Sequence, residues 1–196
     1  MLGYAPNGGE VYEVPSNITG IGGYCFARFA TSSETTAVKS IIIPSSVTTF
    51  HYYITAKWGG FKGNTNLTSI TIADSVVSGR TEFMFNGCSA LTDVKVSSGW
   101  TYWGEEMFNG CSSLTGLTVP ASVTGIGTYD YDYGDYHQVF SGCTALTSIT
   151  ANTQTAPDIT YRTFEGIATG GTLYHPEGSD YSVWLSNSPH CLGYYL

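Results

Sequence analysis

Apolar residues recur at fixed offsets along most of this chain. A phenylalanine is followed six residues later by leucine, and nine and eleven residues later by aliphatic side chains. The clearest copies begin at Phe61, Phe85, Phe108 and Phe140. Apolar positions two residues apart lie on the same side of a strand, so each copy predicts one short strand with a buried face.

A turn signal follows several of these predicted strands. The signals are Pro44–Val47 (PSSV), Ala73–Val76 (ADSV) and Pro120–Val123 (PASV). Proline lacks the N–H that a strand interior needs, so it ends the strand and begins the turn. Weaker copies of the pattern span residues 12–26, 39–50 and 164–173. Together the copies predict seven strands in about six to seven coils, which must stack because one coil cannot bury its apolar face alone.

The combined pattern F-x-x-C-x-x-L-x-x-[IV]-x-[IV]-P-x-S-V-T-x-I-G resembles the Treponema-type, or BspA-like, leucine-rich repeat. The segments FSGCTALTSIT, VPASVTGIG and IPSSVTTF carry the resemblance, which covers about residues 11–176. It implies a right-handed leucine-rich-repeat solenoid of short parallel strands joined by turns and 3-10 connections. It also implies a surface or secreted protein, and several members of the family look like adhesins. The chain departs from the pattern at Asn64, which replaces the cysteine, and at Gly79, which stands near the usual isoleucine.

Two parts of the chain are expected. Residues 1–176 form the solenoid, and residues 177–196 form a C-terminal cap. Ser179 is a candidate N-cap for a short helix in this cap, because serine accepts hydrogen bonds from the first backbone N–H groups of a helix. The side chains expected to cover the last coil are Val183, Trp184 and Leu185. The N-terminus has no comparable cap, which leaves self-association through the ends of the solenoid open.

Three cysteines share one repeat position, three residues after phenylalanine: Cys88, Cys111 and Cys143. Coils stack about 4.8 Å apart, whereas a disulfide needs Cβ atoms about 3.8 Å apart on side chains turned toward each other. We therefore expect reduced, buried thiols here. Cys25 and Cys191 are expected near opposite ends of the solenoid, and no Cys-x-x-Cys pair suggests a metal site.

Composition and charge exclude several classes of partner. Charged residues make up 11% of the chain, well below the usual share of about 25%, and the formal net charge is −8. Without a basic patch, nucleic acid is a poor partner. No segment is apolar for eighteen residues, so membrane insertion is not expected. The first residues lack the pattern of a signal peptide, which suggests a removed leader, a fragment begun at Met1 or another route of export.

Two insertions are expected to leave the solenoid at the same corner, between Phe50 and Phe61 and between Ile126 and Phe140. They flank a coil whose own corner is Gly99–Glu106. Stacking brings equivalent corners to one edge, so their aromatic side chains should form a strip, hereafter the aromatic strip. Its members are Tyr52, Tyr53, Trp58, Trp100, Tyr102, Trp103, Tyr129, Tyr131, Tyr133 and Tyr136. We predict that the strip binds a ligand, because tyrosine and tryptophan give large, rigid contact areas; the alternative is that these rings cover the flank of the solenoid.

Metal binding and catalysis find little support in the sequence. Asp130, Asp132 and Asp135 are a weak candidate calcium site, because the glycine and glutamate positions of an EF-hand loop are not matched; a solvated acidic loop is the alternative. The four histidines are scattered, and no nucleophile or phosphate-binding loop accompanies them. We therefore expect no enzyme and no cofactor.

The resulting hypothesis is a non-catalytic binding or adhesion module that presents the aromatic, acidic strip to a protein or glycan ligand at a cell surface. Two alternatives remain. One is a structural subunit of a fibre, spike or virion, such as a phage decoration or tail-associated protein. The other is an appended specificity domain of a larger enzyme. If the strip does not bind, the strand face with Thr71, Lys95 and Thr118 is the next candidate surface.

Overall fold

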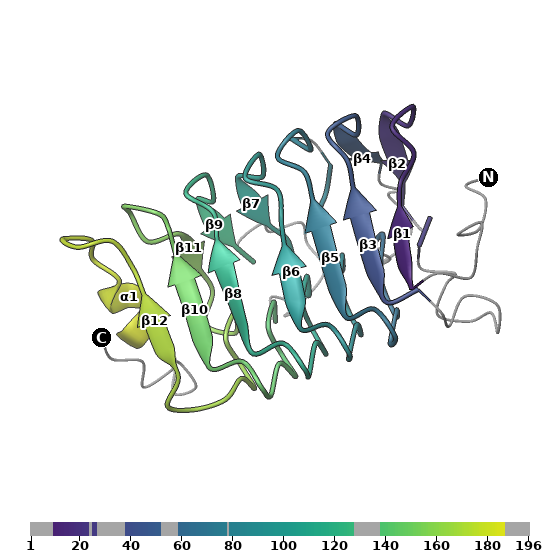
Figure 1. Ribbon diagram of the computed structural model, residues 1–196. Helices are drawn as coiled ribbons and strands as arrows, with labels where there is room; N and C mark the ends of the chain where they lie inside the picture. Colours follow the sequence, from purple (N-terminus) through teal and green to yellow (C-terminus); the bar gives the residue numbers. More distant parts are fainter. Residues whose placement is uncertain are drawn as a thin grey trace, which may run out of the picture.

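A computed structural model describes residues 10–23, 25–26, 38–51, 59–77, 79–127 and 138–186. Seven short parallel strands stand side by side in chain order, hereafter the first row (Figure 1). They are β1 (Val11–Glu13), β3 (Ser40–Ile43), β5 (Ser69–Ile72), β6 (Asp93–Lys95), β8 (Gly116–Val119), β10 (Ser148–Ala151) and β12 (Thr172–Tyr174). Hydrogen bonds join them in two sheets, β1-β3-β5-β6 and β8-β10-β12. The seven predicted strands are therefore confirmed within the described residues.

The strands of the first row bury alternate side chains. In β3 and β5 the inward residues are isoleucines, and Ile41 pairs with Ile70 while Ile43 pairs with Ile72. All four are almost fully enclosed, whereas Ser69 and Thr71 between them face outward. Parallel pairing places equivalent repeat positions next to each other, so the apolar residues of successive turns form one continuous core.

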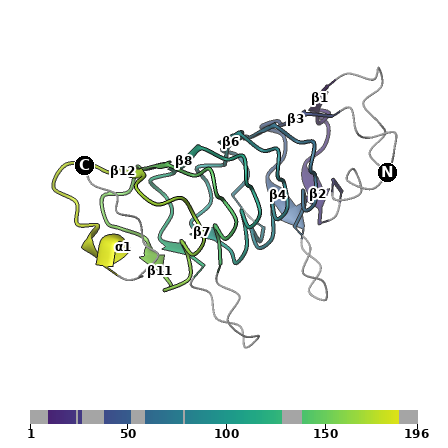
Figure 2. The same cartoon turned by 90° about the horizontal axis from the view of Figure 1, so that it is seen from below.

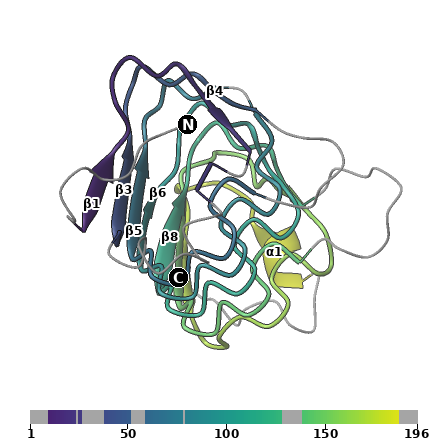
Figure 3. The same ribbon diagram turned by 90° about the vertical axis from the view of Figure 1, so that its right-hand side faces the viewer.

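A second row of strands lies on the opposite side of the stack (Figures 2 and 3). It contains β2 (Gly20–Gly22), β4 (Thr49–His51), β7 (Tyr102–Trp103), β9 (Gly125–Ile126) and β11 (Asp158–Ile159). These strands form two separate sheets, β2-β4 and β7-β9-β11. The turn between them, which contains Gly79, has no strand among its described residues. The second row is therefore interrupted once, between β4 and β7.

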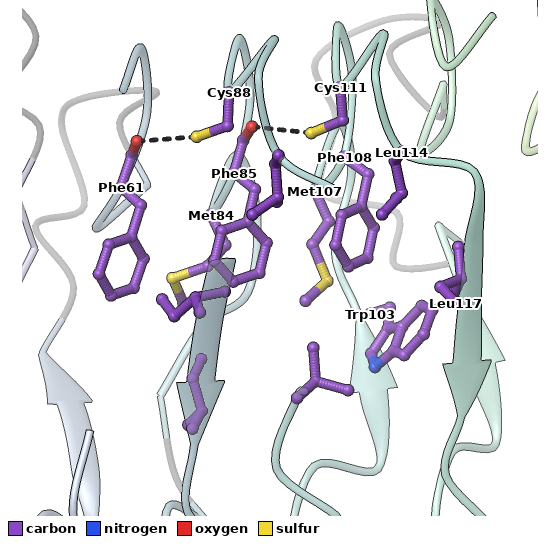
Figure 4. Close-up of a cluster of buried hydrophobic side chains, with 14 of the residues drawn as sticks. Phe61, Met84, Phe85, Cys88, Trp103, Met107, Phe108, Cys111, Leu114 and Leu117 are labelled. Atoms are coloured by element: carbon purple, nitrogen blue, oxygen red, sulfur yellow. Dashed lines mark hydrogen bonds between the residues drawn. The ribbon is translucent and has the colours of Figure 1, made fainter. Parts of the chain in front are cut away.

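A third edge, hereafter the phenylalanine edge, carries stacked aromatic rings. Neighbouring rings are nearly parallel, with centroids 4.9 to 5.6 Å apart. The rings belong to Phe26, Phe61, Phe85, Phe108, Phe140 and Phe164. Each described phenylalanine of this set is almost fully buried, so one ring per turn contributes to a continuous aromatic core (Figure 4).

The repeated cysteines lie beside this stack and are free thiols, as predicted. The Sγ of Cys88 donates to the Phe61 carbonyl at 3.2 Å, and Cys111 donates to Phe85 in the same way (Figure 4). Cys143 repeats the contact one turn later. Asn64 occupies the cysteine position in its own turn, and its Nδ2 donates to the carbonyl of Phe26 at 2.9 Å. The substitution therefore keeps a donor to the preceding turn.

Burial changes the acidity of these thiols. Loss of solvation raises the pKa of Cys88 and of Cys143 to about 12, and raises that of Cys111 well above its usual value. Because the thiolate is the reactive form, the thiols of the phenylalanine edge are inert at neutral pH. Cys25, by contrast, is exposed.

The C-terminal turn ends in the short helix α1 (Ser182–Ser186). Trp184 is buried, its ring lies 5.1 Å from that of Phe164, and its Nε1 donates to the Pro157 carbonyl at 2.8 Å. The predicted helix is present, but the expectation that Val183 and Leu185 also cover the last turn is wrong, because these side chains are 51% and 40% exposed. A five-residue helix packs only one face on the stack.

The N-cap of α1 is also not Ser179. The Ser179 hydroxyl donates to the Pro176 carbonyl at 2.5 Å and lies 2.9 Å from Nδ1 of His175. The Asp180 carboxylate instead accepts from the Ser182 backbone N–H at 2.8 Å.

Among the described residues, no helix has the length and apolar character needed to cross a membrane.

Candidate functional site

The insertions leave the structure at equivalent points of the second row. The chain departs after β4 at His51 and after β9 at Gly127, and the stacked rings resume at Phe61 and Phe140. The predicted common corner is confirmed for these flanking residues. Members of the aromatic strip outside the described residues are Tyr52, Tyr53, Trp58, Tyr129, Tyr131, Tyr133 and Tyr136. The candidate calcium ligands outside them are Asp130, Asp132 and Asp135.

Two other members of the aromatic strip belong to the core. Trp103 is fully buried, and its ring lies 5.5 Å from that of Phe108 (Figure 4). It pairs with Ile126, which is the inward residue of the next strand in the second row. Trp100 stands three residues earlier and is only 3% exposed. The expectation that these two indoles form part of an exposed surface is therefore wrong, because both occupy inward repeat positions.

The sequence contained a signal for this burial. Trp100 and Trp103 are separated by three residues, as are Val47 and Phe50, and Val123 and Ile126. In these two other turns, both positions of this spacing are buried. Giving priority to this repeat spacing over the aromatic character of the segment places both tryptophans in the core.

Tyr102 lies between the two tryptophans and is half-buried. It lines a pocket of about 260 Å³ at the interruption of the second row. One wall comes from the turn that lacks a strand, and the other from the beginning of β7. The lining residues are Val77, Gly79, Arg80, Thr81, Glu82, Trp100, Thr101 and Tyr102.

Gly79 explains why the pocket forms there. It stands three residues after Val76, at the position that Phe50 and Trp103 fill in neighbouring turns. Its φ is +122°, and a Cβ at this position would lie 2.5 Å from the Phe50 carbonyl oxygen. Glycine is therefore required at this position for two reasons: the positive φ of the backbone and the close approach to β4.

Trp100, from the next turn, compensates for the missing side chain at Gly79. The rings of Phe50 and Trp100 lie 6.2 Å apart, although the two residues belong to the turns on either side of the one that contains Gly79. This contact is open to Trp100 because no side chain from Gly79 stands between the two rings. The core thus stays filled, while the surface above it is hollowed.

A threonine joins the two walls of the pocket. The Thr81 hydroxyl donates to the Tyr102 carbonyl at 3.1 Å and accepts from the Gly104 N–H at 2.8 Å. A Cβ at Gly104 would lie 2.5 Å from the Glu82 backbone nitrogen. The walls are therefore closely packed and hydrogen-bonded, which gives the pocket a fixed shape.

The pocket carries one pair of opposite charges. Nη1 of Arg80 lies 3.7 Å from Oε1 of Glu82, whose side chain is only 16% exposed. Burial raises the pKa of the Glu82 carboxyl, while backbone hydrogen bonds and the charge of Arg80 offset part of the rise. Burial thus disfavours the ionised carboxylate, which lies in a poorly solvated wall.

Two polar atoms of the lining lack a hydrogen-bond partner among the described residues. They are Oε2 of Glu82, an acceptor, and Nε1 of Trp100, a donor. A buried polar group without a partner costs about 1–3 kcal/mol, so both atoms favour a ligand that supplies the missing bonds. Within the described part of the chain, no group of three His, Cys, Asp or Glu side chains could hold a metal ion.

Comparison with known proteins agrees with this architecture. The sequence profile of the BspA type leucine rich repeat region matches residues 10–135, in six copies. A leucine rich repeat protein from T. pallidum has a similar structure, with a TM-score of 0.52 and 17% identity over 84% of this chain and 75% of that chain. A leucine-rich repeat protein from Bacteroides ovatus gives a TM-score of 0.49 and 21% identity, over 91% of this chain and 49% of that chain. No curated protein sequence matches significantly.

Proposed function

Because this chain belongs to the BspA-type leucine-rich-repeat family, we propose that it is a non-catalytic binding module for a protein or glycan ligand at a cell surface. Leucine-rich repeats generally serve as interaction modules, and stacked repeats offer long, rigid surfaces for binding. The proposed binding surface is the edge formed by the second row, which includes the pocket and the corners from which the two insertions leave.

One observation carries the proposal: the pocket opens at the single interruption of the second row among the described residues, on the same side of the stack as β4 and β9. The turns on either side keep their strands and their buried side chains. A hollow with a charged pair, between turns that keep their strands, is difficult to explain by stability alone. Binding residues commonly occupy such irregular positions on a rigid scaffold.

The residues of the proposed surface differ from those of the predicted aromatic strip. Tyr102 remains a candidate ligand-binding residue, and Trp100 contributes a wall of the pocket from within the core. Trp103 is removed from the surface, because its indole is fully enclosed. The tyrosines and the tryptophan of residues 52–58 and 128–137 remain candidates on the strength of the sequence.

Two architectural proposals accompany this function. The stacked turns form a right-handed solenoid, supported by the rule that crossovers between parallel strands of one sheet are right-handed in about 98% of cases. Residues 177–196 act as its C-terminal cap, supported by the packing of Trp184 on Phe164. Extracellular exposure, which the family resemblance favours, is tested by digesting intact cells with a protease that cannot enter them.

The binding proposal is tested by shortening residues 128–137 to the length of an ordinary connection and screening the variant on arrays of proteins and glycans. Loop length changes stability by only about 0.6 kcal/mol per doubling, so the melting temperature should change little while ligand capture is lost. Shortening residues 27–37 is the matched control and should preserve capture, because this segment follows Phe26 of the phenylalanine edge and not a strand of the second row. Equal capture by both variants and the parent would contradict the proposed surface.

A further inference from the structure

We propose that the pocket lined by Val77, Gly79–Glu82 and Trp100–Tyr102 binds one ring of a neutral saccharide. This inference rests on the proposed function of the second-row edge and specifies the chemistry of its ligand. Three features of the pocket point to this ligand: its size, its balance of charge and the two lining atoms without hydrogen-bond partners.

Size restricts the ligand first. The pocket holds about 260 Å³, slightly below the range of about 300–1,000 Å³ that is typical of sites for drug-sized molecules. One sugar ring or one amino-acid side chain matches this volume, whereas a folded element does not. A glycan could therefore place a single residue in the pocket while the rest of its chain stays in solvent.

Charge then separates these two kinds of ligand. Arg80 and Glu82 lie on the same wall with opposite charges 3.7 Å apart. A cationic side chain would approach the guanidinium as well as the carboxylate, and an anionic group would face the reverse conflict. The pair therefore favours a neutral molecule that offers both donors and acceptors, which is the character of a sugar ring.

The unpartnered atoms match such a molecule. Oε2 of Glu82 can accept one hydrogen bond and Nε1 of Trp100 can donate one. A sugar hydroxyl both donates and accepts, so adjacent hydroxyls could complete both atoms, and hydrogen bonds are stronger where water is excluded. Both atoms are enclosed in the free protein, so we expect both the Glu82 carboxyl and the Trp100 indole to turn toward the pocket on binding; changes of rotamer are common at binding sites.

The remaining lining suits the mixed surface of a sugar. Tyr102 supplies a half-buried aromatic ring against which the C–H groups of a sugar can pack. The hydroxyl of Thr101 adds polar surface on the same wall, and Val77, which is 62% exposed, forms an apolar part of the lining. The pocket thus combines one aromatic contact, polar groups and a carboxylate within the reach of a single ring.

The test is a titration of the protein with methyl glycosides, in which saturation-transfer NMR measures binding. The neutral probes are the glucose, galactose and N-acetylglucosamine glycosides, the anionic probe is the sialic acid glycoside, and N-acetylarginine amide represents a peptide side chain. We expect at least one neutral glycoside to bind and the other two probes to bind at least tenfold more weakly. The Glu82→Gln variant should lose at least tenfold in affinity, because the amide is uncharged and has one acceptor oxygen where the carboxylate has two.

Glu13→Gln is the matched control, since it removes the same charge from an exposed position on β1. It should bind like the parent. Tyr102→Ala, which removes the aromatic ring, is a second pocket variant if Glu82→Gln unfolds, and it should also lose at least tenfold in affinity. The inference is overturned if no neutral glycoside binds the parent, if Glu82→Gln and Glu13→Gln bind alike, or if the arginine probe or the anionic glycoside binds best. If the saccharide proposal fails but capture of a protein still depends on residues 128–137, the proposed binding function is retained.

Discussion

The phenylalanine edge and the second row differ in how strictly they repeat. Along the phenylalanine edge, every described turn from Phe26 to Phe164 contributes the same stacked ring. In the second row, the equivalent inward position changes from Phe50 to Gly79 to Trp103. One edge is uniform in residue type and geometry, and the other varies from turn to turn.

The two edges differ because their side chains pack against different kinds of neighbour. A stacked ring contacts an identical ring above and below it, so a change of size at one turn leaves a cavity against two others. In the second row, side chains of different volume compensate for one another, as Trp100 does for Gly79. The uniform edge therefore maintains the stack, whereas the varied edge can acquire a pocket without losing the fold.

The largest loss of stability is expected from disrupting the phenylalanine edge. Phe108→Ala should lower the free energy of unfolding by about 3–5 kcal/mol, since it removes a fully buried ring and leaves a cavity between Phe85 and Phe140. Chemical denaturation measures this loss. Tyr174→Ala, at an exposed position of β12, is the control and should cost less than about 1 kcal/mol. Similar losses for both variants would show that the stacked rings do not maintain the fold.

A smaller loss is expected at the interruption of the second row. Gly79→Ala should cost about 2–4 kcal/mol, because it adds backbone strain to a close contact with Phe50. Gly170 also has a positive φ, but nothing lies within 4 Å of its added Cβ. Gly170→Ala should therefore cost only about 1–2 kcal/mol, and the difference in denaturation midpoint isolates the contact with β4. Equal midpoints would mean that β4 does not crowd Gly79.

Most of the fold was predictable from the sequence because the repeat itself is a structural constraint. The apolar positions of a strand recur because their side chains face inward, and the positions of Leu117 and Val119 after Phe108 are enough to assign that face. The cysteine position followed from the same logic. The end of the stack was less predictable, since α1 occurs once and nothing in the repeat decides which of its side chains pack inward.

The candidate site was predictable only in part. The corner that carries the insertions follows from the repeat, but the burial of Trp100 and Trp103 was missed because aromatic residues were read as recognition residues. Gly79 was recognised as a departure from the pattern, yet a missing side chain does not reveal whether the space is filled or open. That outcome depends on Trp100, Phe50 and the displacement of the backbone, which no linear spacing specifies.

Alkaline pH offers a further way to test the uniform edge. The thiols of Cys88 and Cys143 have folded pKa values of about 12, compared with about 8.5 in an unfolded chain. The folded protein therefore binds more protons between these values, and its stability should fall as the pH rises from about 8.5 toward 12. Denaturation midpoints at several alkaline pH values should fall less steeply for Cys143→Ala. Parallel curves would show that the thiols do not contribute.

The smallest effects are expected from two carboxylates near the interruption. Burial raises the folded pKa of Glu82, so its favourable contribution exists at low pH and is lost as the pH rises through that value. A backbone hydrogen bond from Ser98 lowers the pKa of Asp74, whose contribution is lost as the pH falls. Relative to the parent, Glu82→Gln should thus gain stability with rising pH and Asp74→Asn should lose it. Melting curves at pH 4 to 8 that show one common trend would contradict these assignments.

The most direct test of the central claim, that the interruption of the second row is the recognition site, is an NMR titration of the ¹⁵N-labelled protein with the neutral methyl glycosides. We expect shifts confined to the backbone amides of the pocket walls and to the indole N–H of Trp100, which lacks a partner among the described residues. Amides along the phenylalanine edge should stay unchanged. Shifts on the outward strand residues Thr71, Lys95 and Thr118, with an unmoved Trp100 indole, would contradict the account and assign binding to the first row.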